Sequence, residues 1–187
     1  GGIFWRGATR IGAAAGLLYW VSHHAEVTFA DGLRYIHEAQ RVCAGDLKGG
    51  TLAATDHPLH PLMIAAAQRV LGGDDSAPYE WQTAAQAATV LMLVLAVPPL
   101  YLLGRDLFDD ETAGWLGCAL VFANPVIAYV AVNVLSESTF LVFWLWGLWA
   151  SVRFLREGRF VWLPAAIGCG ALAYLTRPEG LLLHLSL

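Results

Sequence analysis

Four apolar segments between residues 81 and 175 restrict the fold of the chain more than any other feature. They cover about residues 81–103, 113–134, 139–152 and 160–175. A helix that crosses a bilayer needs about 20 mostly apolar residues. In lipid only helices and closed barrels satisfy every backbone group, and these segments lack the alternation of a strand. The sequence therefore predicts an all-α fold, a polytopic transmembrane helical bundle.

The composition excludes an ordinary soluble domain. Hydrophobic residues make up 57% of the chain and charged residues 14%, whereas soluble proteins carry about 25% charged residues. No run of Lys and Arg marks a nucleic-acid surface, so membrane lipids are expected partners and nucleic acid is not. The three cysteines, Cys43, Cys118 and Cys169, are odd in number and widely spaced, which argues against a disulfide framework and a zinc site.

The two ends of the chain indicate a piece of a longer protein. The sequence begins at Gly1 and stops at Leu187 inside an apolar run. We expect residues 1–187 to be the amino-terminal part of a larger transmembrane domain, truncated at both ends. Residues 3–22 fit a first span better than a signal peptide, because no small-residue cleavage site follows them.

Prolines and polar breaks set the expected limits of the helices. Pro98 and Pro99 predict a kink or a break near the end of the 81–103 span. Asn124-Pro125 predicts a bend inside the following span. Short charged loops are expected at 104–112 and 153–159.

The arginines of the short loops predict an orientation in the membrane. If the spans alternate, these arginines share one face, which the positive-inside rule makes cytoplasmic: Arg6, Arg10, Arg105, Arg153, Arg156 and Arg159. A long first outer loop, about 23–80, then lies on the other face. The polar break at 136–138 and the turn at 176–180 fall on that face too, and this convergence predicts a site there.

The polar segment 28–61 contains the first candidate for chemistry, Asp31. Helical spacing over 31–42 predicts a helix along the membrane interface. Its apolar residues are expected to lie on lipid and its charged residues to face water: Leu33, Tyr35, Ile36, Ala39 and Val42 against Arg34, Glu38 and Arg41. Asp31 lies at the start of this helix, where it can cap the helix or act as a general base.

The segment 56–61 contains the second candidate site. Asp56, His57 and His60 are three potential metal ligands within five residues. The prolines favour extended geometry at both histidines and so predict a stiff turn. No pattern in the chain requires a cofactor. A divalent metal at these residues, a carboxylate role for Asp56 without metal, and a rigid entry into an interfacial helix over 61–71 all remain open.

Three further charged residues are expected at the outer ends of spans. Arg177 and Glu179 flank Pro178, and Glu137 lies between two serines. An ionisable residue at membrane depth is a functional candidate by default because its insertion is costly. Arg177 can bind a lipid phosphate or serve as an interfacial anchor. Glu137 can mark a break between spans or line a cavity.

Several segments, taken in order, resemble a known family. They are ADGLRYIHEAQRV, DHPLHPLMIA, GRDLF, ETAGWLGCALVFANPVIAYVAVNVLSESTFL and ALAYLTRPEGLLL. In this order they resemble the amino-terminal half of GT-C type membrane glycosyltransferases that use polyprenyl-phosphate-linked sugars. The protein mannosyltransferase-like and aminoarabinose transferase-like enzymes of bacteria belong to that group. The resemblance covers nearly the whole chain.

The resemblance implies an activity on the extracytoplasmic face of the cell (inner) membrane. Asp31 matches the family's catalytic carboxylate, which assists attack of an acceptor hydroxyl on the anomeric carbon. The donor is a polyprenyl-phosphate-linked sugar, the acceptor a lipid, glycan or protein, and Arg177 is the candidate for stabilising the leaving phosphate. Many relatives have a second acid beside the first. Here Gly32 follows Asp31, so a second carboxylate must come from elsewhere, with Asp56 the candidate.

Two other classes of function fit parts of the sequence. A transporter or flippase for a lipid-linked substrate would use the acidic residues for coupling, and it predicts ionisable residues near the bilayer midplane. A non-catalytic membrane subunit would tolerate changes at Asp31 and Arg177. The clustering of charges outside the spans favours the interfacial enzyme.

Overall fold

The computed structural model describes residues 12–13, 16–18, 20–21, 24–49, 57–74 and 76–185. Within these ranges the regular structure is helical, and no strand occurs. The elements are α2 (Ala30–Cys43), α3 (Leu59–Leu71), α4 (Pro78–Phe108), α5 (Glu111–Phe122), α6 (Pro125–Val132), α7 (Glu137–Glu157), α8 (Trp162–Tyr174), the 3-10 turn η2 (Pro178–Gly180) and α9 (Leu181–Leu185). The predicted all-α class is confirmed.

Within the described part of the chain, two helices are long and apolar enough to cross a membrane, namely α4 and α7. The pair α5 and α6 forms a third candidate span that bends by 57° at its break. The predicted bend at Asn124-Pro125 is therefore confirmed, and Asn124 Oδ1 caps α6 by accepting from Val126 N. The segment expected to be a fourth span holds α8, which has only 13 residues.

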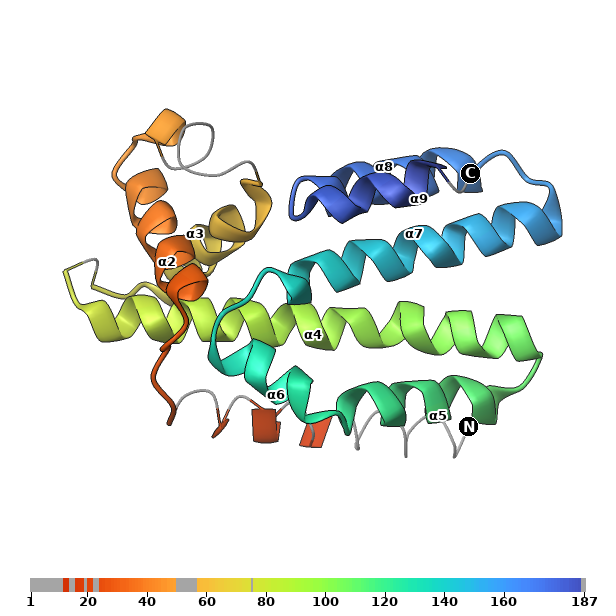
Figure 1. Cartoon of the computed structure of the whole chain (residues 1–187), viewed down its shortest axis with the longest axis horizontal. Coiled ribbons are helices and arrows are strands. Elements are labelled where there is room, and N and C mark those ends of the chain that lie inside the picture. The colour runs from red at the N-terminus through yellow and green to blue at the C-terminus, as the bar shows by residue number, and fades with distance from the viewer. Residues whose placement is uncertain are drawn as a thin grey trace.

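Helix α4 continues through Pro98 and Pro99 to Phe108, so the expected break there is wrong. Each proline removes one backbone hydrogen bond, but packing can hold a helix together across such a gap. Pro99 is fully buried, and α4 is packed between α5 and α7 (Figure 1). The helices also reach further into the predicted charged loops: α4 ends at Phe108 and α7 at Glu157.

Helices α4, α7 and α8 lie side by side, α5 covers the other side of α4, and α2 and α3 pack at one end (Figure 1). We call this the loop end; it comprises α2, α3, the 133–139 segment and residues 175–180. A buried cluster fills the space between α2, α3 and the first turns of α4, and includes Ala39, Ile64 and Trp81.

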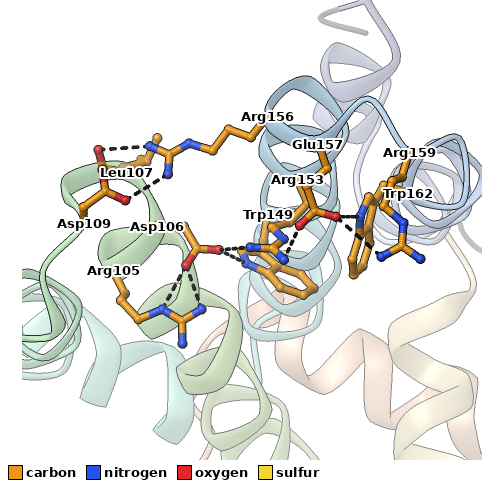
Figure 2. A network of polar contacts seen from close by, with 10 residues as sticks. All are labelled: Arg105, Asp106, Leu107, Asp109, Trp149, Arg153, Arg156, Glu157, Arg159 and Trp162. Atoms are coloured by element: carbon orange, nitrogen blue, oxygen red, sulfur yellow. Dashed lines mark hydrogen bonds and ion pairs between the residues drawn. The ribbon is translucent and has the colours of Figure 1, made fainter.

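The opposite end, here the arginine end, holds a connected set of ion pairs (Figure 2). Asp106 accepts from Arg105, at 2.7 and 2.9 Å, and from Trp149 Nε1 at 2.9 Å. Arg153 lies 3.5 Å from the same carboxylate and stacks between the rings of Trp149 and Trp162. Asp109 forms a separate ion pair with Arg156 at the same end. Four of the six arginines predicted to share one face lie at this end, namely Arg105, Arg153, Arg156 and Arg159. Arg6 and Arg10 lie outside the described residues.

Candidate functional site at the loop end

Helix α2 buries its apolar face against protein. Tyr35, Ile36, Ala39 and Val42 lie in the core shared with α3 and α4, so the expectation that they contact lipid is wrong. Glu38, expected to face water, is only 3% exposed. The periodicity identified the helix and its apolar stripe correctly, but α3 covers that stripe and part of the polar face beside it.

Asp31 does not cap α2. The helix begins after Phe29, which makes no side-chain cap, and Asp31 lies in the first turn. Its carboxylate is 48% exposed and forms an ion pair with Arg34 at 3.3 Å. A negative charge in the first turn is stabilised by the helix dipole. The capping interpretation is therefore wrong, and Asp31 presents a partly exposed carboxylate at the loop end.

The entry to α2 is fixed by Asn133. Its Oδ1 accepts from Thr28 N, Thr28 Oγ1 and Phe29 N at 3.4, 3.2 and 3.2 Å. The Asn133 carbonyl packs against Gly32, where an added Cβ would overlap the carbonyl oxygen. A side chain at 32 is therefore excluded by the close approach of the two backbones.

His60 lies in the first turn of α3, so the extended geometry predicted for it is wrong. Pro58 is the N-cap and Pro61 falls within the first turn, where a missing N–H costs nothing. The His60 side chain is buried, with Nδ1 2.9 Å from Thr139 Oγ1 and Nε2 3.2 Å from the Val134 carbonyl oxygen. Burial lowers the pKa of His60 to about 4, although the bond to Val134 acts against it, so the ring is neutral.

Of the 56–61 segment, the structure describes residues 57–61. Asp56 lies outside the described residues. His57 Nδ1 is 2.9 Å from the Tyr174 carbonyl oxygen, and Leu59 N donates to Leu175 O at 3.0 Å, so the start of α3 is joined to the end of α8. Both ring nitrogens of His60 are already engaged. Among the described residues no three His, Cys, Asp or Glu side chains gather as a metal site would require.

Arg177 forms the charged part of the loop end. Its guanidinium pairs with Glu137, in the first turn of α7, and with Glu179 at 3.3 Å. Burial opposes the charged form of Arg177, but hydrogen bonds and charges from Glu179 and Glu137 outweigh it and raise the pKa of the guanidinium. Hydrogen bonding to Arg177 in turn lowers the pKa of the Glu179 carboxyl, with a smaller contribution from His57. The structure thus brings Arg177, Glu137, Glu179 and His57 together.

Asp31 reaches this group through the 133–139 segment and has no recorded contact with Arg177. The segment binds the start of α2 through Asn133 and contains Glu137, the partner of Arg177. Sequence reasoning singled out Glu137 and the polar break at 136–138 but missed Tyr35, Asn133 and Thr139, which make connecting hydrogen bonds. The available signal was the cluster of polar residues in NVLSEST, between two apolar runs.

Comparison with known proteins identifies the family. Residues 56–187, well over half of the chain, match the family described as dolichyl-phosphate-mannose-protein mannosyltransferase, a group of GT-C type membrane glycosyltransferases. No curated protein and no solved structure matches the chain. The match begins beyond α2, so it includes Arg177, Glu137, His57 and His60 but not Asp31. The chain therefore belongs to the dolichyl-phosphate-mannose-protein mannosyltransferase family.

Proposed function

We propose that this chain is the amino-terminal part of an enzyme that transfers a sugar from a polyprenyl-phosphate-linked donor to a hydroxyl-bearing lipid, glycan or protein. The acceptor oxygen attacks the anomeric carbon and its proton passes to Asp31. The bond from that carbon to the phosphate oxygen breaks, the phosphate leaves with the electron pair, and the configuration at carbon inverts. Arg177 binds the departing phosphate, as preorganised cations do for developing anions.

The proposal rests chiefly on one observation. The half-exposed carboxylate of Asp31 and the guanidinium of Arg177, which is paired with carboxylates, lie at the same end of the bundle. Arg177 makes a close pair with Glu137 and a longer one with Glu179, whose side chain is 50% exposed. Exposed pairs contribute little, so a phosphate that gains charge can replace Glu179 at low cost. Glu137 then keeps the guanidinium in place while its other donors bind the phosphate.

The distribution of charge supports the enzyme over a transporter. Segments 81–104 and 138–152, the central parts of α4 and α7, contain no Asp, Glu, Lys or Arg. A coupled transporter is expected to carry ionisable groups near the bilayer midplane. Four arginines lie at the arginine end, so the positive-inside rule favours a cytoplasmic arginine end and an extracytoplasmic loop end in the cell membrane.

The test is Asp31→Asn in the full-length protein, assayed in membranes with a panel of lipid-phosphate sugars. The loss of a general base lowers the rate by about 10²–10⁴-fold. Asp46→Asn is the matched control, because Asp46 is another arginine-paired, half-exposed carboxylate of the same loop, bonded to Arg41 at 2.8 Å. Sugar transfer should fall with the first variant and persist with the second. Equal activity of the wild type and Asp31→Asn would remove the base assignment, and tolerance at both Asp31 and Arg177 would indicate a non-catalytic subunit.

A further inference from the structure

We propose that His60 is a positioning residue for the transfer reaction, and that it acts by holding the 133–139 segment in the conformation that places Asp31 and Arg177 at one end of the bundle. The inference rests on the proposed function. His60 touches neither Asp31 nor Arg177, so its contribution must pass through the segment that both of them depend on.

The segment contains a strained residue. Val134 has φ +56°, in the left-handed region, and its side chain is fully buried. A β-branched residue rarely adopts this conformation and persists in it only where the surroundings impose it. The other described non-glycine residue with positive φ is Asp109, which ends α4 and belongs to a type that tolerates this region. Val134 therefore requires an external constraint.

His60 supplies that constraint at both sides of the turn. A carbonyl oxygen only accepts, so His60 Nε2 carries the proton and donates to Val134 O at 3.2 Å. Nδ1 must then accept from the Thr139 hydroxyl at 2.9 Å. One ring thus ties residue 134 to residue 139, across the start of α7, and its burial keeps water from competing for either bond.

Helix α2 is seated on the same structure. The Tyr35 ring meets the His60 ring edge-on, with centroids 5.0 Å apart, and the Tyr35 hydroxyl donates to Ser136 Oγ at 3.2 Å. Asn133, next to Val134, binds the backbone just before Asp31. Glu137, three residues after Val134, pairs with Arg177. If the turn at Val134 relaxed, Asn133 and Glu137 would move relative to each other, and so would the two groups proposed to act on the substrate.

The test compares two amide replacements that keep different parts of the imidazole. His60→Gln can present an N–H near the position of Nε2 and so retain the bond to Val134 O. His60→Asn can reach only toward the position of Nδ1 and leaves Val134 O without a donor. Both are measured in the full-length protein, alone and combined with Val134→Gly, because glycine adopts positive φ without strain and no longer needs the constraint.

The first readout is transfer kinetics with lipid-phosphate sugars. His60→Asn should lower kcat by up to about 100-fold, the scale of a 1 Å misplacement of reacting groups, with a smaller change in KM. His60→Gln should stay near the wild type, and His60→Asn combined with Val134→Gly should recover much of the lost kcat. Equal losses in the Gln and Asn variants, or no recovery with Val134→Gly, would overturn the proposal.

The second readout does not depend on activity. Hydrogen exchange of the backbone amides in the 133–140 region reports the turn directly, through bonds such as Leu135 N to Val130 O and Phe140 N to Ser136 O. Exchange there should accelerate in His60→Asn and not in His60→Gln, and Val134→Gly should reverse the change. If the wild type transfers no sugar, the proposed function fails while this readout still decides whether His60 holds the turn. Unchanged exchange in His60→Asn would refute the role even in an active enzyme.

Discussion

Gly32→Ala is the substitution that most directly tests the close packing of α2 against the 133–139 segment. An added Cβ would lie 2.9 Å from Val27 Cγ1 and 3.2 Å from the Asn133 carbonyl carbon, and it would overlap the carbonyl oxygen. The atoms of Asn133 are backbone and cannot rotate away. Either α2 or the segment must shift, and the hydrogen bonds from Thr28 and Phe29 to Asn133 are the first to lengthen.

Two opposing effects set the magnitude for Gly32→Ala. Three hydrogen bonds to Asn133 Oδ1 at about 1 kcal/mol each amount to roughly 3 kcal/mol if all are lost. Alanine returns at most about 1 kcal/mol relative to glycine, because Gly32 lies in the first turn of α2 and not in its interior. The net expectation is a destabilisation of roughly 2 kcal/mol. The clash therefore outweighs the gain in helix propensity.

The assay is thermal unfolding of the purified protein in detergent, with sugar transfer measured on the same sample. A loss of 1 kcal/mol lowers Tm by about 2–4 °C in a domain of 150–250 residues and by less in a longer chain, so Gly32→Ala should lower the Tm by up to roughly 8 °C. Gly117→Ala in α5 is the control, because an added Cβ there meets nothing within 4 Å and propensity alone acts. A Gly32→Ala protein with the Tm and activity of the wild type would refute the packing argument.

Two further predictions concern buried and exposed charges. Asp106→Asn should destabilise the arginine end by about 3 kcal/mol, since Asp106 is 6% exposed and its loss removes the carboxylate partner of Arg105 and one of the two carboxylate partners of Arg153. Asp109→Asn should cost less than about 0.5 kcal/mol, because the Asp109 side chain is 85% exposed; urea or thermal unfolding of the two variants distinguishes them. The folded-state pKa of His60 lies near 4 and the ordinary value is 6.5, so the unfolded chain takes up the proton first as the pH falls. Roughly 3 kcal/mol of stability should be present above pH 6.5 and be lost as the pH falls toward 4, whereas His60→Gln should lack this component.

The long helices were predictable from sequence because their signal is local. A run of apolar residues of bilayer length specifies a helix whatever its neighbours are. The bend at Asn124-Pro125 was equally predictable, because both the capping side chain and the missing N–H lie in the sequence itself. Pro98 and Pro99 do not break the helix, because the continuity of α4 depends on packing by α5 and α7, which no local pattern encodes.

The charged residues of the candidate site were predictable from the sequence, but the hydrogen bonds that join them were not. Asp31, Glu137 and Arg177 stand out because ionisable residues are rare in this chain. The residues that join them are uncharged, and they pair with partners about 75 to 105 positions away, as His60 does with Thr139 and Thr28 with Asn133. The periodicity of α2 also did not reveal whether its apolar face contacts lipid or protein, because both environments favour the same apolar stripe.

The two ends of the bundle solve the problem of burying polar groups in different ways, and the difference fits their proposed roles. At the arginine end the buried Asp106 is compensated by arginines and a tryptophan, so charge is neutralised inside the protein. At the loop end the groups linking α2, α3 and α7 are a neutral imidazole, an amide and hydroxyls, bonded to one another. Neutral groups satisfied in this way place no competing charge beside Asp31 and Arg177, whose own charges stay partly exposed to solvent. At the loop end one partner of Arg177, the half-exposed Glu179, is a carboxylate that a lipid phosphate can displace at low cost, which supports the proposal that sugar transfer occurs there.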